Sequence, residues 1–192
     1  MPDDTSVPGR YIGLDIHKFY LVATGVDAGK NQIYGPVTVP NTQLDHWIVK
    51  DLGPLDAVVL EMTTNTWTMV DLLEPHVQSV TVVHPPYVHL ITRAQVMTDK
   101  KAALVLAQLH AAGLLPPVWV PPKEVRDLRA IVAQRRKMVK LATQARNRLQ
   151  SLLHRHNIVP PSKKEAYTPE GREWWQSLPL SALEHVRIHT DL

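Results

Sequence analysis

The chain has 192 residues and a net charge of +3, with 44% hydrophobic and 20% charged residues. This balance is typical of a globular protein with one core and an extension, and it excludes a disordered chain. The absence of cysteine excludes disulfides and thiolate zinc sites. The N-terminus lacks a signal-peptide pattern and no apolar run could cross a bilayer, so we expect a cytoplasmic protein with no membrane partner.

The first elements are three predicted strands, over residues 11–16, 19–25 and 30–39, which are rich in Val, Ile and Tyr and are punctuated by Gly and Asn. Short turns connect them, so we expect antiparallel neighbours. A helix of about ten residues then begins at Asn41, whose side chain is a candidate cap.

Two short apolar strands follow, over residues 56–60 and 80–83, with a helix over 66–76 between them. Fully apolar strands are typical of a sheet that helices cover on both faces. Three antiparallel strands, then helix, strand, helix and strand, is the element order of a ribonuclease H-like fold. The sequence therefore predicts an α/β domain over residues 1–120, with a mixed sheet and flanking helices.

Two more helices are predicted, over residues 87–94 and 99–113, and Gly113 is a suitable stop for the second. Four of the seven residues from 116 to 122 are proline, a composition that excludes a helix. This segment predicts a boundary or a stiff connector.

A single long helical pattern runs from Lys123 to about His156 without Gly or Pro. Such a helix spans roughly 50 Å at 1.5 Å per residue. Because it is too long to be buried in a domain of this size, we expect a coiled coil with a second copy over 121–160. Residues 161–192 are expected to be a linker with a short helix around 170–176. The apolar positions at three- and four-residue spacings are Leu128, Ile131, Val132, Val139, Ala142, Ala145, Leu149, Leu152 and Leu153.

The positive charge is concentrated in this predicted helix, which carries ten basic residues and two acids between Lys123 and Arg155. The rest of the chain has eleven basic residues and sixteen acids. A solvated coiled-coil face usually carries both signs, so this asymmetry favours phosphate contacts with a nucleic acid. The candidate nucleic-acid-binding residues are Arg126, Arg129, Arg135, Arg136, Lys137, Lys140, Arg146 and Arg148.

Three isolated acids lie where a carboxylate is unexpected. Asp15 interrupts an apolar run, Glu61 follows another, and Asp99 comes after Thr98 at a predicted helix start. Acids at strand ends and helix starts can converge, and converging carboxylates attract a hard cation such as Mg²⁺. Metal-dependent phosphodiester chemistry is built on such sites. Each acid taken alone also fits a simpler interpretation, as a solvated strand end or a helix N-cap.

His17 has two interpretations of the same kind. It lies two residues after Asp15, so the alternation of a strand places both side chains on one face. From there His17 could reach a phosphate, or it could be a solvated turn residue.

Four short motifs, in this order and spacing, resemble a known family: the insertion-sequence transposases with a DEDD RuvC-like N-terminal domain. These are related to pilin-gene-inverting recombinases and are described as bridge-RNA-guided recombinases. The resemblance implies that Asp15, Glu61 and Asp99 hold Mg²⁺ against a scissile phosphate. It also implies DNA, a guide RNA and a second copy of the chain as partners. The motifs are GLDIHK (13–18), LEMT (60–63), VHP with TDKKAA (83–85 and 98–103) and GREW (171–174).

The chain departs from the family pattern in two ways. The family has a second acid three residues after Asp99, where this chain has Ala102. Either the acid was lost naturally or it was removed to block cleavage. The family's C-terminal domain, which supplies a nucleophilic serine, is not among these residues, so we expect a piece of a longer protein that is inactive alone. A stand-alone RuvC-like nuclease or junction resolvase, and a non-catalytic module for nucleic-acid binding and dimerisation, are the alternatives.

Overall fold

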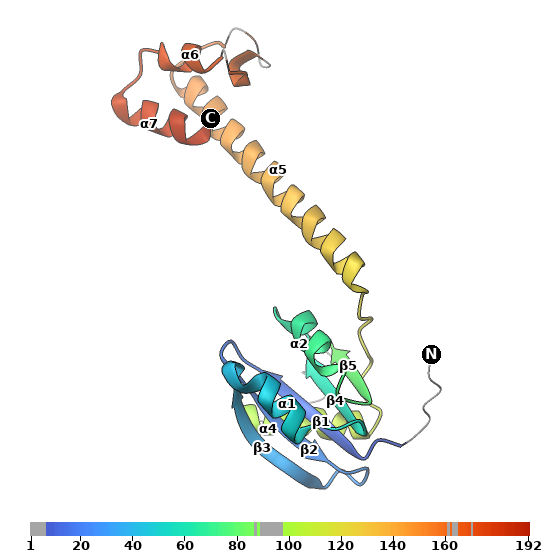
Figure 1. Ribbon diagram of the computed structural model, residues 1–192. Helices are drawn as coiled ribbons and strands as arrows, with labels where there is room; N and C mark the ends of the chain where they lie inside the picture. The colour runs from blue at the N-terminus through green and yellow to red at the C-terminus, as the bar shows by residue number, and fades with distance from the viewer. Residues whose placement is uncertain (1–6, 87, 89–97, 161, 163–164, 170) are drawn as a thin grey trace. The chain divides into compact units, whose positions relative to one another are not determined.

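The computed structural model describes residues 7–86, 88, 98–160, 162, 165–169 and 171–192. The chain divides into two compact units, Met1–Val120 and Pro121–Leu192, which are described separately below (Figure 1). The helix predicted over 87–94 lies outside the described residues, apart from residue 88.

The first unit is built on a five-stranded mixed sheet with the strand order β3-β2-β1-β4-β5. The first three strands pair antiparallel, and β1, β4 and β5 run parallel. This arrangement confirms the predicted α/β class and is consistent with a ribonuclease H-like fold. The strands are β1 (Arg10–Ile16), β2 (Tyr20–Val26), β3 (Gln32–Pro40), β4 (Asp56–Glu61) and β5 (Ser79–Val83).

Helices cover the sheet on both faces (Figure 1). The helices are α1 (Leu44–Asp51), α2 (Thr66–Leu73) and α4 (Asp99–Ala111). Successive side chains of a strand point to opposite faces. Leu14 and Leu60 therefore enter the core formed with α1 and α2, whereas Val59 packs with Leu106 of α4 on the other face. This double coverage explains why β4 is apolar between its two end residues, Asp56 and Glu61.

The closest approach between α4 and the sheet is at Gly13 in the middle of β1. A Cβ atom at this position would lie 2.1 Å from the carbonyl oxygen of Ala103 and 2.6 Å from the backbone nitrogen of Ala107. Only a residue without a side chain allows the helix backbone to come this near to the strand. The glycine of the GLDIHK motif thus sets the depth at which α4 packs.

The helical segment after β3 begins differently from the prediction. Residues Asn41–Gln43 form a short 3₁₀ turn, η1, ahead of α1, and no side chain caps either segment. The expectation that Asn41 is a helix cap was therefore wrong. Its side-chain amide instead donates to the carbonyl oxygen of Lys18 at 2.9 Å, and its backbone N–H donates to that of Phe19 at 3.0 Å. Asn41 thereby supports the β1–β2 turn.

The second unit consists of helices, α5 (Lys123–Arg155), α6 (Gly171–Gln176) and α7 (Ala182–Asp191), with a short 3₁₀ segment, η2 (Glu165–Tyr167). Its core joins the end of α5 to the two later helices, with Leu149, Leu152 and Leu153 packing against Trp175 and Ile188. Across the described parts of both units, no helix is long and apolar enough to span a bilayer.

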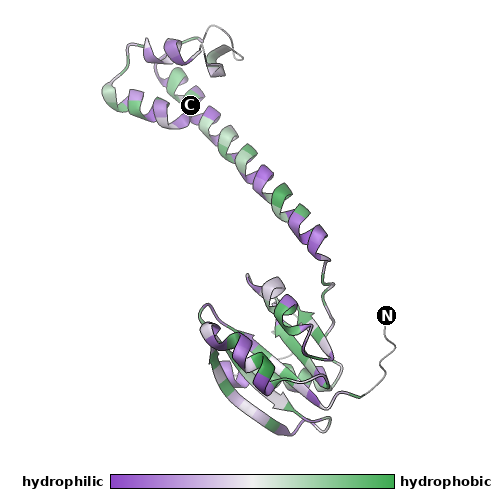
Figure 2. Ribbon diagram, in the orientation of Figure 1, coloured by the Kyte–Doolittle hydropathy of each residue, from purple (hydrophilic) through white to green (hydrophobic). Residues whose placement is uncertain are grey.

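Most of α5 lies outside this small core. Every residue from 127 to 144 is exposed, and hydrophobic and hydrophilic segments alternate along the helix (Figure 2). Five of the exposed apolar residues lie on one side of the helix, at spacings of three, four and seven residues, and define an apolar stripe. The members of the stripe, which are 41–67% exposed, are Leu128, Ile131, Val132, Met138 and Val139.

Replacing Gly13 with alanine should destabilise the first unit by about 1–3 kcal/mol, because the new methyl group must displace the α4 backbone. Thermal unfolding followed by circular dichroism measures the change. Gly53→Ala is the matched control, since nothing lies within 4 Å of a Cβ atom there, and it should change stability by less than about 0.5 kcal/mol. Equal effects of the two substitutions would contradict the proposed close contact.

Candidate metal centre

The parallel pairing of β1 and β4 places two of the predicted acids at one edge of the sheet. Leu14 is in register with Leu60, so Asp15 and Glu61 follow side by side at the carboxyl ends of the two strands. Strand alternation places Asp15 on the same face as Gly13, where α4 packs. By the same alternation, Glu61 shares the face of Val59.

The third acid comes from the start of α4. Thr98 caps this helix by accepting a hydrogen bond from the backbone N–H of Lys101 at 3.4 Å, so Asp99 is its first residue. An acid in the first turn interacts favourably with the positive end of the helix dipole. Because α4 packs closely on β1 at Gly13, its first residue reaches the end of the same strand.

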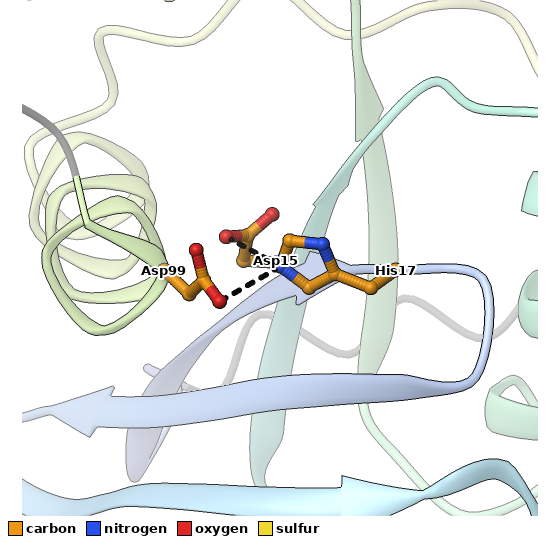
Figure 3. A group of neighbouring side chains, drawn as sticks. All are labelled: Asp15, His17 and Asp99. Carbon is orange, nitrogen blue, oxygen red and sulfur yellow. Dashed lines mark hydrogen bonds and ion pairs between the residues drawn. The ribbon is translucent and has the colours of Figure 1, made fainter.

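The imidazole of His17 faces the carboxylates of both Asp15 and Asp99 (Figure 3). Its Nε2 atom is 3.3 Å from Oδ2 of Asp15 and 3.4 Å from Oδ2 of Asp99. In the described part of the chain these residues form a group whose possible ligand atoms all lie within 4.8 Å of one another. Glu61 is on the neighbouring strand but is not a member of this group. The structure therefore brings together two of the three predicted acids, with a histidine that faces both.

Tyr20 is a fourth contributor to this cluster, and sequence reasoning missed it. Its hydroxyl donates a hydrogen bond to Oδ2 of Asp99 at 3.0 Å, and its ring stacks on His17 with the ring centroids 4.6 Å apart. The backbone N–H of His17 donates to the carbonyl oxygen of Tyr20 at 2.9 Å. Part of the signal was the short turn, because pairing Asp15 with Val22 places Tyr20, two residues before Val22, on the Asp15 face.

Burial makes the cluster electrostatically costly. The pKa of Asp15 is raised, first because burial disfavours the carboxylate, and further by the negative charge of Asp99, while His17 acts in the opposite direction. The pKa of Tyr20 is also raised, chiefly by its hydrogen bond to Asp99, so the phenol keeps the proton that it donates. A cation shared by Asp15 and Asp99 would relieve this repulsion.

The donor set fits a divalent metal ion. Two carboxylate oxygens and one imidazole nitrogen are common metal ligands in proteins, and they converge here from β1, the β1–β2 turn and α4. Ala102 lies one turn further along α4, and its backbone N–H donates to the carbonyl oxygen of Thr98 at 2.8 Å. Its methyl side chain offers no ligand atom.

Comparison with known proteins identifies the family. The family model of the IS110-type DEDD transposases, described as "Transposase", matches residues 12–158, well over half of the chain. The chain belongs to this transposase family. The matched region includes Asp15, Glu61 and Asp99 and the whole of α5.

A curated relative agrees with this assignment at low identity. The chain is 22% identical over 171 residues to the protein named "Putative transposase y4qE" of Sinorhizobium fredii (strain NBRC 101917 / NGR234). The alignment covers 86% of this chain and 44% of the relative. The chain thus spans less than half the length of the relative that it matches.

The predicted nucleic-acid-binding residues of this transposase-family chain differ in their surroundings. Arg148 donates from Nε to Oδ2 of Asp191 at 2.8 Å, an ion pair that ties α5 to α7, and this pair lowers the pKa of Asp191. The guanidinium of Arg146 lies 5.6 Å from the ring centroid of Tyr167. Residues that lie on the exposed stretch of α5 are Arg129, Arg135, Arg136, Lys137 and Lys140. Arg126 is half-buried.

Asp15→Asn should stabilise the first unit at pH 7 when no divalent ion is present. Because the folded state raises the pKa of Asp15 above 3.8, the wild type loses stability as pH rises above that value. Asparagine does not ionise, so its advantage should grow between pH 4 and pH 7. Melting temperatures measured in EDTA over this range test the trend.

Asp27→Asn is the control for this pH series. Hydrogen bonds from Asn31 lower the pKa of Asp27, so its carboxylate contributes stability that is present above pH 3.8 and lost in acid. The control should therefore be destabilised at pH 7 and approach the wild type as pH falls. The same trend for both substitutions would mean that Asp15 carries no burial penalty.

Proposed function

We propose that this chain is the N-terminal, metal-binding part of an RNA-guided DNA transposase that cuts and exchanges DNA strands. The observation that carries the proposal is the convergence of Asp15 and Asp99 in a chain that the transposase family model matches over residues 12–158. In this proposal Glu61, at the end of the neighbouring strand, completes the acidic edge. The nucleophile is a serine supplied outside these 192 residues, so the chain alone binds DNA without cutting it.

The metal-binding half of the proposal assigns distinct tasks to the residues of the first unit. Asp15 and Asp99 would hold Mg²⁺ or a similar divalent ion, and Tyr20 would orient the Asp99 carboxylate through its hydrogen bond. When bound, such an ion supplies positive charge to the phosphoryl group that is transferred. Ala102, in place of an acid, leaves the centre one carboxylate short of the family pattern.

The nucleic-acid half of the proposal depends on the basic residues of α5. With 3.6 residues per turn, Lys137 and Lys140 lie on the side of the helix away from the apolar stripe and Arg136 borders it, and all are exposed. Contacts from such residues to phosphates are independent of sequence. If a guide RNA recognises the target by base pairing, the protein needs only to bind the phosphate backbone.

The apolar stripe supports pairing with a second copy. Leu149, Leu152 and Leu153 lie near the same side of α5 and are buried against α6 and α7, whereas the stripe from Leu128 to Val139 is exposed. Exposed apolar rows with this spacing are typical of a coiled-coil seam. Arg135 falls within the stripe, and its long side chain would extend out of the seam to contact the nucleic acid.

Replacing Arg136, Lys137 and Lys140 together with alanine should weaken DNA binding and reduce its salt dependence. Each lost phosphate contact lowers the slope of log K against log salt by about 0.9, so up to roughly three units should disappear. Fluorescence anisotropy with a labelled duplex at several salt concentrations gives the slope. The control is Gln134, Gln144 and Gln150 replaced by alanine, which leaves the charge of the helix unchanged.

The same titration tests the metal centre. Mg²⁺ should strengthen DNA binding by the wild type relative to EDTA, and this gain should be lost in Asp15→Asn. A Mg²⁺ effect that survives in Asp15→Asn would remove the catalytic part of the proposal and leave a nucleic-acid-binding module. An unchanged salt slope in the triple variant would place the nucleic-acid surface elsewhere.

Sedimentation should show that the protein is a dimer held by the apolar stripe. Ile131→Glu combined with Met138→Glu should dissociate it, because two charges per copy would be buried in the seam. Ala133→Glu combined with Gln144→Glu adds the same charge at exposed positions on the side opposite the stripe and should leave the dimer intact. A wild-type monomer at high protein concentration would refute the pairing.

A further inference from the structure

The metal centre proposed above contains one side chain that neither the family comparison nor the three predicted acids account for, which is the imidazole of His17. Its Nε2 atom faces Oδ2 of both Asp15 and Asp99, at nearly equal distances of 3.3 and 3.4 Å. Ligand atoms bound to one small divalent ion at about 2.1 Å lie no more than roughly 4.2 Å apart. Both measured separations are within this limit.

The position of His17 is fixed by its surroundings. The residue is in the turn between β1 and β2, where its N–H bonds to the carbonyl oxygen of Tyr20 and its ring stacks on the Tyr20 ring. Its side chain is 33% exposed. Asn41 holds the next two residues of the turn through their carbonyl oxygens. An imidazole held in this way needs little reorganisation to bind an ion, which favours its use as a ligand.

Tyr20 connects the imidazole to the carboxylate opposite. Its ring supports His17 by stacking, and its hydroxyl donates to the Asp99 oxygen that faces His17. One side chain from β2 therefore orients two of the three donor groups. Such outer partners are the usual way in which proteins fix the direction of metal ligands.

We infer that His17 is a nitrogen ligand of this metal centre and that the centre consequently takes a divalent transition ion in preference to Mg²⁺. The inference rests on the proposed metal-binding function. Carboxylates suit both Mg²⁺ and Mn²⁺, whereas imidazole suits transition ions such as Fe²⁺, Ni²⁺ and Zn²⁺ and is a poor ligand for Mg²⁺. In a centre with two carboxylates and one imidazole, the imidazole nitrogen therefore favours a transition ion over Mg²⁺.

The test uses Mn²⁺ as the probe, because its unpaired electrons report directly on bound nitrogen. The wild type should bind Mn²⁺ in an electron paramagnetic resonance titration, and pulsed measurements should show coupling to one ¹⁴N nucleus. His17→Ala should lose this coupling and weaken Mn²⁺ binding by about tenfold, with a smaller change for Mg²⁺ measured by competition. His17→Gln keeps a polar side chain of similar length and should lose the coupling as well.

His46→Ala is the matched control, since His46 is exposed on α1 and should leave both the coupling and the affinity unchanged. Circular dichroism shows whether each variant is folded. Mn²⁺ binding that requires Asp15 but lacks ¹⁴N coupling in the wild type would overturn the role of His17 and keep the metal centre. Absence of Mn²⁺ binding, or binding unaffected by Asp15→Asn, would overturn the inference together with the proposed function.

Discussion

The candidate centre depends on the direct contact between the backbone of α4 and Gly13 of β1. A methyl group at this position would already lie 2.1 Å from a carbonyl oxygen of the helix, so the separation of the two elements is set by backbone atoms. Interiors are close-packed and transmit such shifts. A larger residue would lift the helix and carry Asp99 away from Asp15, although these acids are 84 residues apart in the sequence.

The cluster contains an unfavourable repulsion between the carboxylates of Asp15 and Asp99, which His17 and Tyr20 partly offset. Burial, and after it the negative charge of Asp99, raises the pKa of Asp15. His17 and Tyr20 each contribute a polar contact to these carboxylates. Such groups are held by the surrounding fold, with the strand ends, the turn and the cap of α4 each fixing one of them. Stability lost in this way is common at functional sites.

The sequence predicted the sheet well because its signals are local. Strand alternation, apolar runs and turn residues gave all five strands and their succession along the chain, since each pattern reflects burial on one or both faces. Asp15 and Asp99 were also identified correctly as neighbours of a strand end and a helix start. The register that places Asp15 beside Glu61 follows from the same pattern, whereas the separation of their carboxylates depends on side-chain packing that no local pattern encodes.

Other features were missed or misassigned. Asn41 is of a residue type that often caps helices, but its side-chain amide instead bonds to the β1–β2 turn. Tyrosine is an ordinary residue in a strand, so nothing local singles out Tyr20. Its role depends on Asp99 of α4, which is distant in the sequence. The helix α7 was not predicted, although a capping box was present, in which Ser181 and Glu184 satisfy each other's backbone donors.

The uninterrupted α5 helix has a consequence for how its length can change. Its first part presents the apolar stripe and its last part is anchored by Leu149, Leu152 and Leu153, so one rigid element fixes the angle between two apolar surfaces. Deleting a single residue between them would turn one surface by about 100° relative to the other. Deletions or insertions of seven residues would nearly preserve the angle. Length variation in this helix should therefore be tolerated in steps of whole heptads, and a change of one or two residues should be more damaging than most substitutions.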